Sequence, residues 1–196
     1  MDRVVLLGDS PFLKEVEYLL HYVTDKYYTV GINKVIEKCR LDLHAFTDFK
    51  MIKLTNFYPS VSTLTLYSYG DLIKKDKKVL IDTFTYEDDY VWKKGDKLAW
   101  CGFTHDYVLS YLISQGTKEI ILLGAADFIN GNHYSNEREF NRSKLLEDKS
   151  KQFITDCANM YVNIKTCNPK SDIKGVEYMP IEKLLEYWQK TDILIS

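Results

Sequence analysis

Asp127, His133 and Tyr134 follow the most apolar strand expected in this chain, residues 119–123, within a polar and glycine-containing stretch. A carboxyl, an imidazole and a phenol in one loop can move protons and bind hydroxyl or phosphate groups. Because imidazole titrates near neutral pH, His133 is a candidate acid, base or phosphate partner. The alternative is that His133 is an exposed loop residue without a role.

A second candidate segment is the turn Gly8-Asp9-Ser10-Pro11 near the amino terminus. Gly8 would let a ligand approach the backbone closely, and the N–H groups of a helix start can hold a phosphate. The turn is not a P-loop, since no Gly-Lys-Ser/Thr follows, and it lacks the GxGxxG pattern. Ser10 and Pro11 are equally typical of a plain capped helix start.

Three further polar residues stand where strands end or helices begin. Asn33 ends an expected strand, and its amide suits a ribose or a base edge, although it is also a common turn residue. Asp48 ends another and can bind a hydroxyl, hold a magnesium ion or cap a turn. Thr104 is expected to cap a helix whose N–H groups face the ligand. His21, on an expected helix, and His44, within an expected strand, are interpreted as structural.

The elements that must position these residues alternate between short apolar strands and amphipathic helices. Apolar runs predict buried strands at residues 4–7 and 119–124, and residues 28–32, 43–46 and 162–167 are further strand candidates. Helical spacing predicts helices over residues 11–23, 104–115, 137–160 and 180–188. This alternation predicts an α/β fold that is Rossmann-like, with a mostly parallel sheet and helices on both faces. Ligands bind such sheets beyond the carboxyl ends of the strands, where the strand order reverses.

The segment from 51 to 94 is the least regular part of the sequence. Residues 61–69 alternate Thr and Ser with Val, Leu and Tyr, and residues 79–85 form another strand candidate. We interpret 51–94 as irregular strands with a flap or insertion. Because no linker, repeat or low-complexity tract interrupts the chain, residues 1–196 are expected to form a single nucleotide-binding domain.

Composition excludes some classes of function. The formal net charge of -2 argues against general nucleic-acid or membrane-surface binding. The four cysteines form no CxxC pair, so zinc binding is not indicated and reduced thiols in a cytoplasmic protein are expected. The sequence shows no transmembrane segment. It leaves the oligomeric state open, a homo-oligomer included.

Four segments resemble the bacterial sialyltransferases of the Campylobacter lipooligosaccharide type and, more distantly, the hydroxymethylpterin pyrophosphokinase-like proteins. Residues 7–15 are similar to the family's amino-terminal glycine and Ser-Pro segment, and residues 31–33 to its strand-end asparagine. Residues 116–128 with Tyr134 resemble its Gly-Tyr-Lys-Glu strand, the Asp-Phe after it and its downstream tyrosine. Residues 167–171 resemble its late Cys-Pro-Asn-Ser turn.

The resemblance implies a cytidine nucleotide carrying a sugar as the ligand. It implies that Gly8, Asp9 and Ser10 lie near phosphate or ribose, Asn33 near the nucleotide, and Thr104 and Tyr134 near the phosphate. Asp127 belongs to the same nucleotide-binding set. The family's catalytic histidine follows the tyrosine, but residues 135–142 contain no histidine, so His133 would have to replace it.

These observations leave three hypotheses for function. The first is a glycosyltransferase that uses a nucleotide-sugar without an obligatory cofactor or metal, with His133 as base and Tyr134 at the leaving phosphate. The second is a non-catalytic protein that binds or sequesters a nucleotide. The third is an ATP-dependent, pyrophosphokinase-like enzyme that needs magnesium, with Asp48 or Asp127 as ligand.

Overall fold

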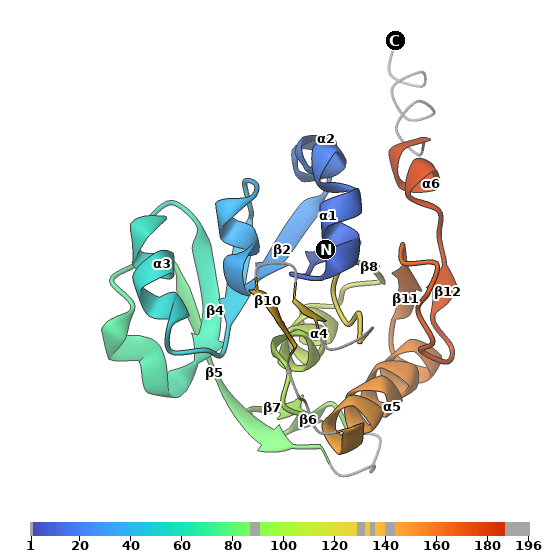
Figure 1. The fold of residues 1–196 in the computed structure, drawn as a ribbon. Coiled ribbons are helices and arrows are strands. Elements are labelled where there is room, and N and C mark those ends of the chain that lie inside the picture. The colour runs from blue at the N-terminus through green and yellow to red at the C-terminus, as the bar shows by residue number, and fades with distance from the viewer. Residues whose placement is uncertain (1, 87–90, 129–131, 134–135, 140–143, 187–196) are drawn as a thin grey trace.

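The computed structural model describes residues 2–86, 91–128, 132–133, 136–139 and 144–186 (Figure 1). For residues 132–133, 136–139 and 144 only the backbone is described.

A ten-stranded sheet forms the centre of the fold, in the order β12-β11-β8-β1-β2-β3-β4-β5-β7-β6. Neighbouring strands pair in parallel from β12 to β7, and β6 runs antiparallel to β7. The expected α/β fold with a mostly parallel sheet is therefore confirmed. The strands are β1 (Arg3–Leu7), β2 (Tyr28–Ile32), β3 (Leu43–Phe46), β4 (Ser62–Leu66), β5 (Lys78–Thr85), β6 (Lys93–Lys94), β7 (Lys97–Trp100), β8 (Glu119–Leu123), β11 (Asn163–Thr166) and β12 (Glu177–Tyr178).

Helices cover both faces of the sheet (Figure 1). Alternate residues of β1 point to opposite faces, as the twofold period of a strand requires. Val4 and Leu6 join the core under α4 and α5, while Val5 and Leu7 join the core under α1 and α2. The helices are α1 (Pro11–Glu15), α2 (Leu20–Lys26), α3 (Met51–Phe57), α4 (Thr104–Ser114), α5 (Lys144–Met160) and α6 (Ile181–Glu186), with 3₁₀ turns at Glu17–Leu19, Asn33–Glu37 and Tyr67–Leu72.

The strand order reverses between β1 and β8. From β1 the chain adds β2, β3, β4, β5 and β7 on one side of the sheet. Helix α4 then returns the chain to β8, on the other side of β1, and β11 and β12 follow outward. This reversal is the switch point at which open parallel sheets bind ligands beyond the strand ends.

The segment 51–94 is more regular than its sequence suggests. Helix α3 and strands β4 and β5 lie within it, and both strands pair in parallel as members of the main sheet. The strand candidates at 61–69 and 79–85 are thus present as β4 and β5, regular rather than irregular, and residues 87–90 of the expected flap lie outside the described residues. The threonines of β4 look polar in the sequence, yet Thr63 and Thr65 are fully buried in the structure. Their hydroxyls can be buried because they find partners, as the Thr65 hydroxyl does by donating to the Phe46 carbonyl at 2.8 Å.

Two carboxyl-terminal helices also differ from expectation. The helix expected over 137–160 is described from Lys144, and the prediction is wrong for Asn136–Glu139, a strand, β10, that pairs with β9 (Asn132–His133). The last helix ends its described course at Glu186, so residues 187–188 of the prediction lie outside the described residues. Among the helices of the described part, none is long and apolar enough to cross a membrane.

Candidate functional site

Two glycines bring the loops after β1 and β8 into direct contact at the switch point. Gly8 N–H donates to the Leu123 carbonyl at 3.0 Å. A Cβ on Gly8 would overlap the backbone of Gly124 and Ala125, and a Cβ on Gly124 would lie 2.8 Å from the Gly8 carbonyl oxygen. Gly124 also has φ +71°, a conformation that side chains disfavour. Neither position therefore accepts a larger residue without moving the loops.

The side chains of Ser10 and Asp127 form a hydrogen bond at the same switch point. The Ser10 hydroxyl donates to Asp127 Oδ2 at 2.6 Å, joining the loop after β1 to the loop after β8. Ser10 takes the N-cap position of α1, with Pro11 behind it, as expected, but its side chain makes no cap bond. The expected capping role is therefore wrong, because the hydroxyl binds Asp127 instead.

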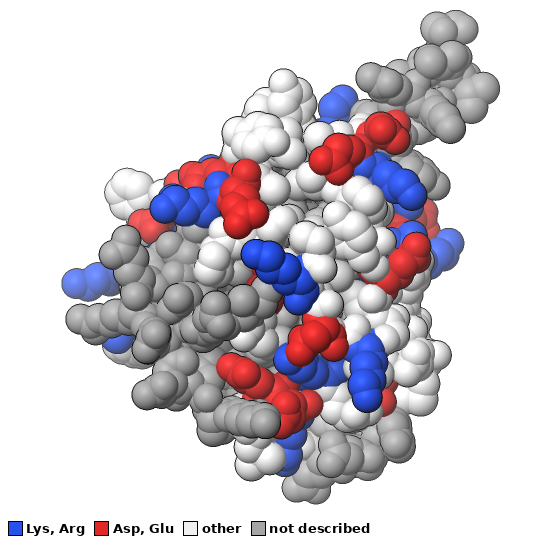
Figure 2. Space-filling model, turned by 45° about the vertical axis from the view of Figure 1, so that its right-hand side comes forward, with Lys and Arg blue, Asp and Glu red and all other residues white. Residues whose placement is uncertain are grey.

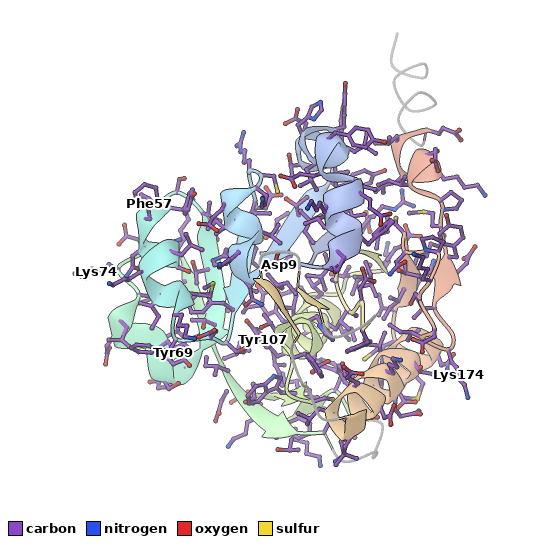
Figure 3. The ribbon with its side chains drawn as sticks, in the orientation of Figure 1. Asp9, Phe57, Tyr69, Lys74, Tyr107 and Lys174 are labelled. Carbon is purple, nitrogen blue, oxygen red and sulfur yellow. The ribbon has the colours of Figure 1, made fainter. Side chains whose placement is uncertain are left out.

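The environment of Asp127 suits proton transfer. Burial raises the pKa of this carboxyl, and the hydrogen bond from Ser10 partly offsets that rise. Asn168 follows β11, and its Oδ1 accepts the Lys170 N–H at 2.9 Å, while its buried Nδ2 has no hydrogen-bond partner among the described residues. A carboxyl with a raised pKa at a switch point is a candidate general base. Asp9 is also buried here and lies at the start of α1, near the middle of the molecule (Figure 3).

Asn33 directly follows β2 and begins the 3₁₀ turn after it, in a conformation that few side chains adopt. Its φ is +53°, and its buried Oδ1 has no hydrogen-bond partner among the described residues. His44 Nε2 lies 2.7 Å from the Asn33 carbonyl oxygen, and His44 Nδ1 lies 3.1 Å from the Thr55 hydroxyl. The imidazole therefore donates to Asn33, accepts from Thr55 and holds the strand end in place.

His44 should make the fold sensitive to mild acid. Burial lowers the pKa of His44 from 6.5 to about 4. The unfolded chain therefore binds a proton that the folded chain excludes, and stability should fall as pH drops from 6.5 to 4, by up to about 1.4 kcal/mol per pH unit. His44→Gln keeps a donor and removes this titration, so the acid loss should shrink in urea unfolding at several pH values. The exposed His21→Gln is the control, and an equal acid loss in wild type and His44→Gln would refute this role.

Thr104 lies at the same carboxyl edge but not as a cap. Phe103 occupies the N-cap position and Thr104 is the first residue of α4, so the expected cap is wrong. The side-chain hydrogen bonds at this helix start come from Asp106, whose Oδ2 accepts the N–H groups of Phe103 at 2.9 Å and Cys101 at 3.1 Å. The Thr104 hydroxyl lies 3.1 Å from the Thr47 hydroxyl, which joins α4 to the end of β3.

A buried serine, histidine and aspartate beside this helix start form a structural network. His105 Nε2 lies 3.0 Å from the Ser150 hydroxyl, and that hydroxyl donates to Asp106 Oδ1 at 2.5 Å. A catalytic triad needs the serine and the aspartate on opposite ring nitrogens, but here Asp106 lies 3.3 Å from the same Nε2. Ser150 is fully buried, so the network fastens α5 to α4.

Other candidates from the sequence separate from this group or fall outside the description. Asp48 is exposed and its Oδ1 accepts the Lys50 N–H at 2.9 Å, as a local turn cap does. The backbone of His133 lies in β9, but its side chain is not described, and Tyr134 lies outside the described residues. Across the described part of the chain, no three or more His, Cys, Asp or Glu side chains gather as a metal site would require.

Neither the charged side chains on the face shown in Figure 2 nor the thiols of Cys39, Cys157 and Cys167 indicate a second site. Acidic and basic side chains intermix on the face shown in Figure 2, without a broad area of one sign. The four cysteines form no disulfide. Burial raises the pKa of the Cys39 and Cys167 thiols to about 12 and raises that of Cys157, which makes them poor nucleophiles.

The structure thus gathers Gly8, Asp9, Ser10 and Asp127 at the switch point, places Asn33 one strand away, and places Thr104 against the end of β3. Sequence reasoning did not predict that the Thr47 hydroxyl contacts Thr104 or that Asn168 accepts the Lys170 N–H, although both residues directly follow predicted strands. Comparisons of this chain with protein-family models, with curated proteins and with solved structures found no match.

Proposed function

We propose that this protein is a glycosyltransferase that uses a nucleotide-sugar donor bound along the carboxyl edge of the sheet. The observation that supports this most is the Ser10–Asp127 contact across the strand-order reversal, between two loops that also touch at Gly8 and Gly124. It places a carboxyl of raised pKa where ligands of parallel sheets bind.

In this proposal Asp127 accepts the proton of the acceptor hydroxyl. The acceptor oxygen then forms a bond to the anomeric carbon, while the bond from that carbon to the phosphate oxygen breaks and the nucleotide leaves. Ser10 orients the carboxylate through its hydroxyl. His133, the base favoured by the sequence, remains a second candidate in the segment that follows β8, and the resemblance assigns the leaving phosphate to Tyr134.

The remaining polar groups suit the other parts of such a donor. Carboxylates repel phosphate, so Asp9 fits sugar or ribose hydroxyls better than the phosphate that the resemblance suggests. Asn33 lies between the carboxyls and the hydroxyls along this edge, and its amide suits an oxygen of the nucleotide's phosphate or ribose. Thr47 and Thr104 offer hydroxyls beside the start of α4, where helix polarity favours a phosphate. This arrangement requires no metal, whereas magnesium belongs to the alternative pyrophosphokinase-like reaction.

A thermal-shift screen of nucleotides and nucleotide-sugars, each with and without magnesium, tests this proposal. A ligand at 100 times its Kd should stabilise the fold by about 2.7 kcal/mol, which raises Tm by roughly 5–10 °C for a chain of this size. We expect a nucleotide-sugar to give that rise without magnesium.

The other outcomes point to the alternatives. A rise with ATP that requires magnesium would favour diphosphoryl transfer. A rise with a nucleotide-sugar but no product with a broad panel of acceptors would favour a binding or sequestering protein. No rise with any member of the panel would contradict all three.

A further inference from the structure

We propose that Phe49 and Tyr69 form an aromatic shelf on which the base of the nucleotide stacks. This inference rests on the proposed function and adds an orientation for the ligand. Phe49 follows β3, and Tyr69 follows β4, so both rings lie at the carboxyl edge of the sheet.

Tyr69 is held firmly in place. Its ring stacks on the fully buried ring of Phe46, with centroids 6.2 Å apart and an interplanar angle of 10°. Its hydroxyl donates to the Thr47 carbonyl at 2.9 Å. A ring fixed by packing below and a hydrogen bond at its tip loses little freedom when a ligand binds.

Phe49 completes the shelf from the solvent side. Its ring meets Tyr69 edge to face, at 6.1 Å between centroids and 71° between planes. The side chain is nevertheless 61% exposed, which leaves a large apolar surface in water. Bases stack on such rings whatever their hydrogen-bonding pattern, because every base has a π face.

The shelf is continuous with the candidate site. Thr47 contacts Tyr69 through its carbonyl and Thr104 through its hydroxyl. Neighbouring strands lie about 4.8 Å apart, so the three steps from β8 to β3 span about 14 Å. Along that edge the chemistry changes from carboxyls at β8 and β1, through an amide at β2, to hydroxyls and aromatic rings at β3 and β4.

This order matches a nucleotide-sugar laid along the edge. The sugar and its reacting carbon would lie at Asp127, and the base would lie on Phe49 and Tyr69. Phe57 is a matched control for Phe49. It is also an exposed phenylalanine beside α3, but it is the last residue of that helix, whereas Phe49 precedes the helix. Phe57 is 77% exposed and lies at the opposite end of α3 from Tyr69 (Figure 3).

The test is calorimetric titration of wild type, Phe49→Ala and Phe57→Ala with the 5′-monophosphates of cytidine, uridine, adenosine and guanosine, and with ribose 5-phosphate, which has no base. Phe49→Ala should weaken binding of the preferred nucleotide by about 5- to 150-fold, the range of base–aromatic stacking. It should leave ribose 5-phosphate within twofold of wild type. Phe57→Ala should change neither ligand.

Phe49→Leu separates stacking from mere apolar contact, since it keeps bulk and removes the π face. It should weaken the nucleotide nearly as much as alanine does, whereas Phe49→Trp should retain affinity. Nucleotide affinity unchanged in Phe49→Ala, equal losses for nucleotide and ribose 5-phosphate, or full affinity in Phe49→Leu would each overturn the shelf while leaving the proposed function standing. Failure of wild type to bind any of the five ligands would overturn both.

Discussion

Asp127→Asn is expected to lower turnover by about 10²–10⁴-fold while nucleotide affinity changes little. The substitution keeps the shape of the side chain and its contact with Ser10, but it removes the group that takes the acceptor's proton. A base acts in the transition state, so its loss should appear in kcat rather than in binding. Product formation and donor affinity are measured together.

The pH profile identifies the base more specifically. Because burial raises the pKa of Asp127, wild-type activity should fall with decreasing pH at a point above the usual range of an aspartate. Asp127→Asn should lose this acidic limb. His133→Ala should retain it if Asp127 is the base.

The exposed Asp48→Asn is the matched control, since Asp48 also follows a parallel strand and its oxygen only caps a turn. Full activity in Asp127→Asn with its loss in His133→Ala would transfer the role to His133. Full activity in both variants would remove the catalytic role from this loop.

Gly8→Ala is expected to destabilise the fold by about 3 kcal/mol. The new Cβ would overlap the backbone of Gly124 and Ala125, which belongs to the loop after β8 and has no flexible side chain to move aside. Overpacking of this kind typically costs about 1–3 kcal/mol, and backbone contacts fall at the upper end. Urea unfolding should show a lower midpoint with an unchanged slope.

Gly95→Ala separates crowding from backbone conformation. Gly95 has φ +60° and open space around the new Cβ, so only the conformational penalty of roughly 1–2 kcal/mol should remain. Gly8→Ala as stable as wild type would show that the two loops do not meet as described.

The central part of the fold was predictable because its signals are local. Residues 4–7 and 120–123 are continuous apolar runs, and both are buried in parallel strands at the switch point. Gly116, with φ +71°, ends α4 where the sequence placed the end of a helix. A run of apolar residues predicts burial on both faces of a strand, and a glycine after a helix predicts a helix end, so residue types along a short stretch were enough to predict these features.

The failures arose where tertiary contacts decide the structure. Buried threonines in β4 resemble a polar segment until their partners are known, as the bond from Thr65 to the Phe46 carbonyl shows. Threonine is a residue type that often caps helices, yet Thr104 is not the cap. Asp106, three residues after the N-cap Phe103, accepts the Phe103 N–H instead. Ser10 likewise reaches a residue 117 positions away, a pairing that no local pattern contains.

The most direct measurement of the central claim is amide chemical-shift mapping of the ¹⁵N-labelled protein on addition of a nucleotide-sugar. The account predicts the largest shifts at Gly8, Ser10, Asn33 and Gly124, together with the start of α4. A groove of about 580 Å³ at the opposite end of α4, lined by Gly116, Thr117, Tyr161 and Asn163 among others, serves as the internal reference. Shifts confined to that groove, or no shifts with any nucleotide-sugar of the panel, would contradict a ligand site at the switch point.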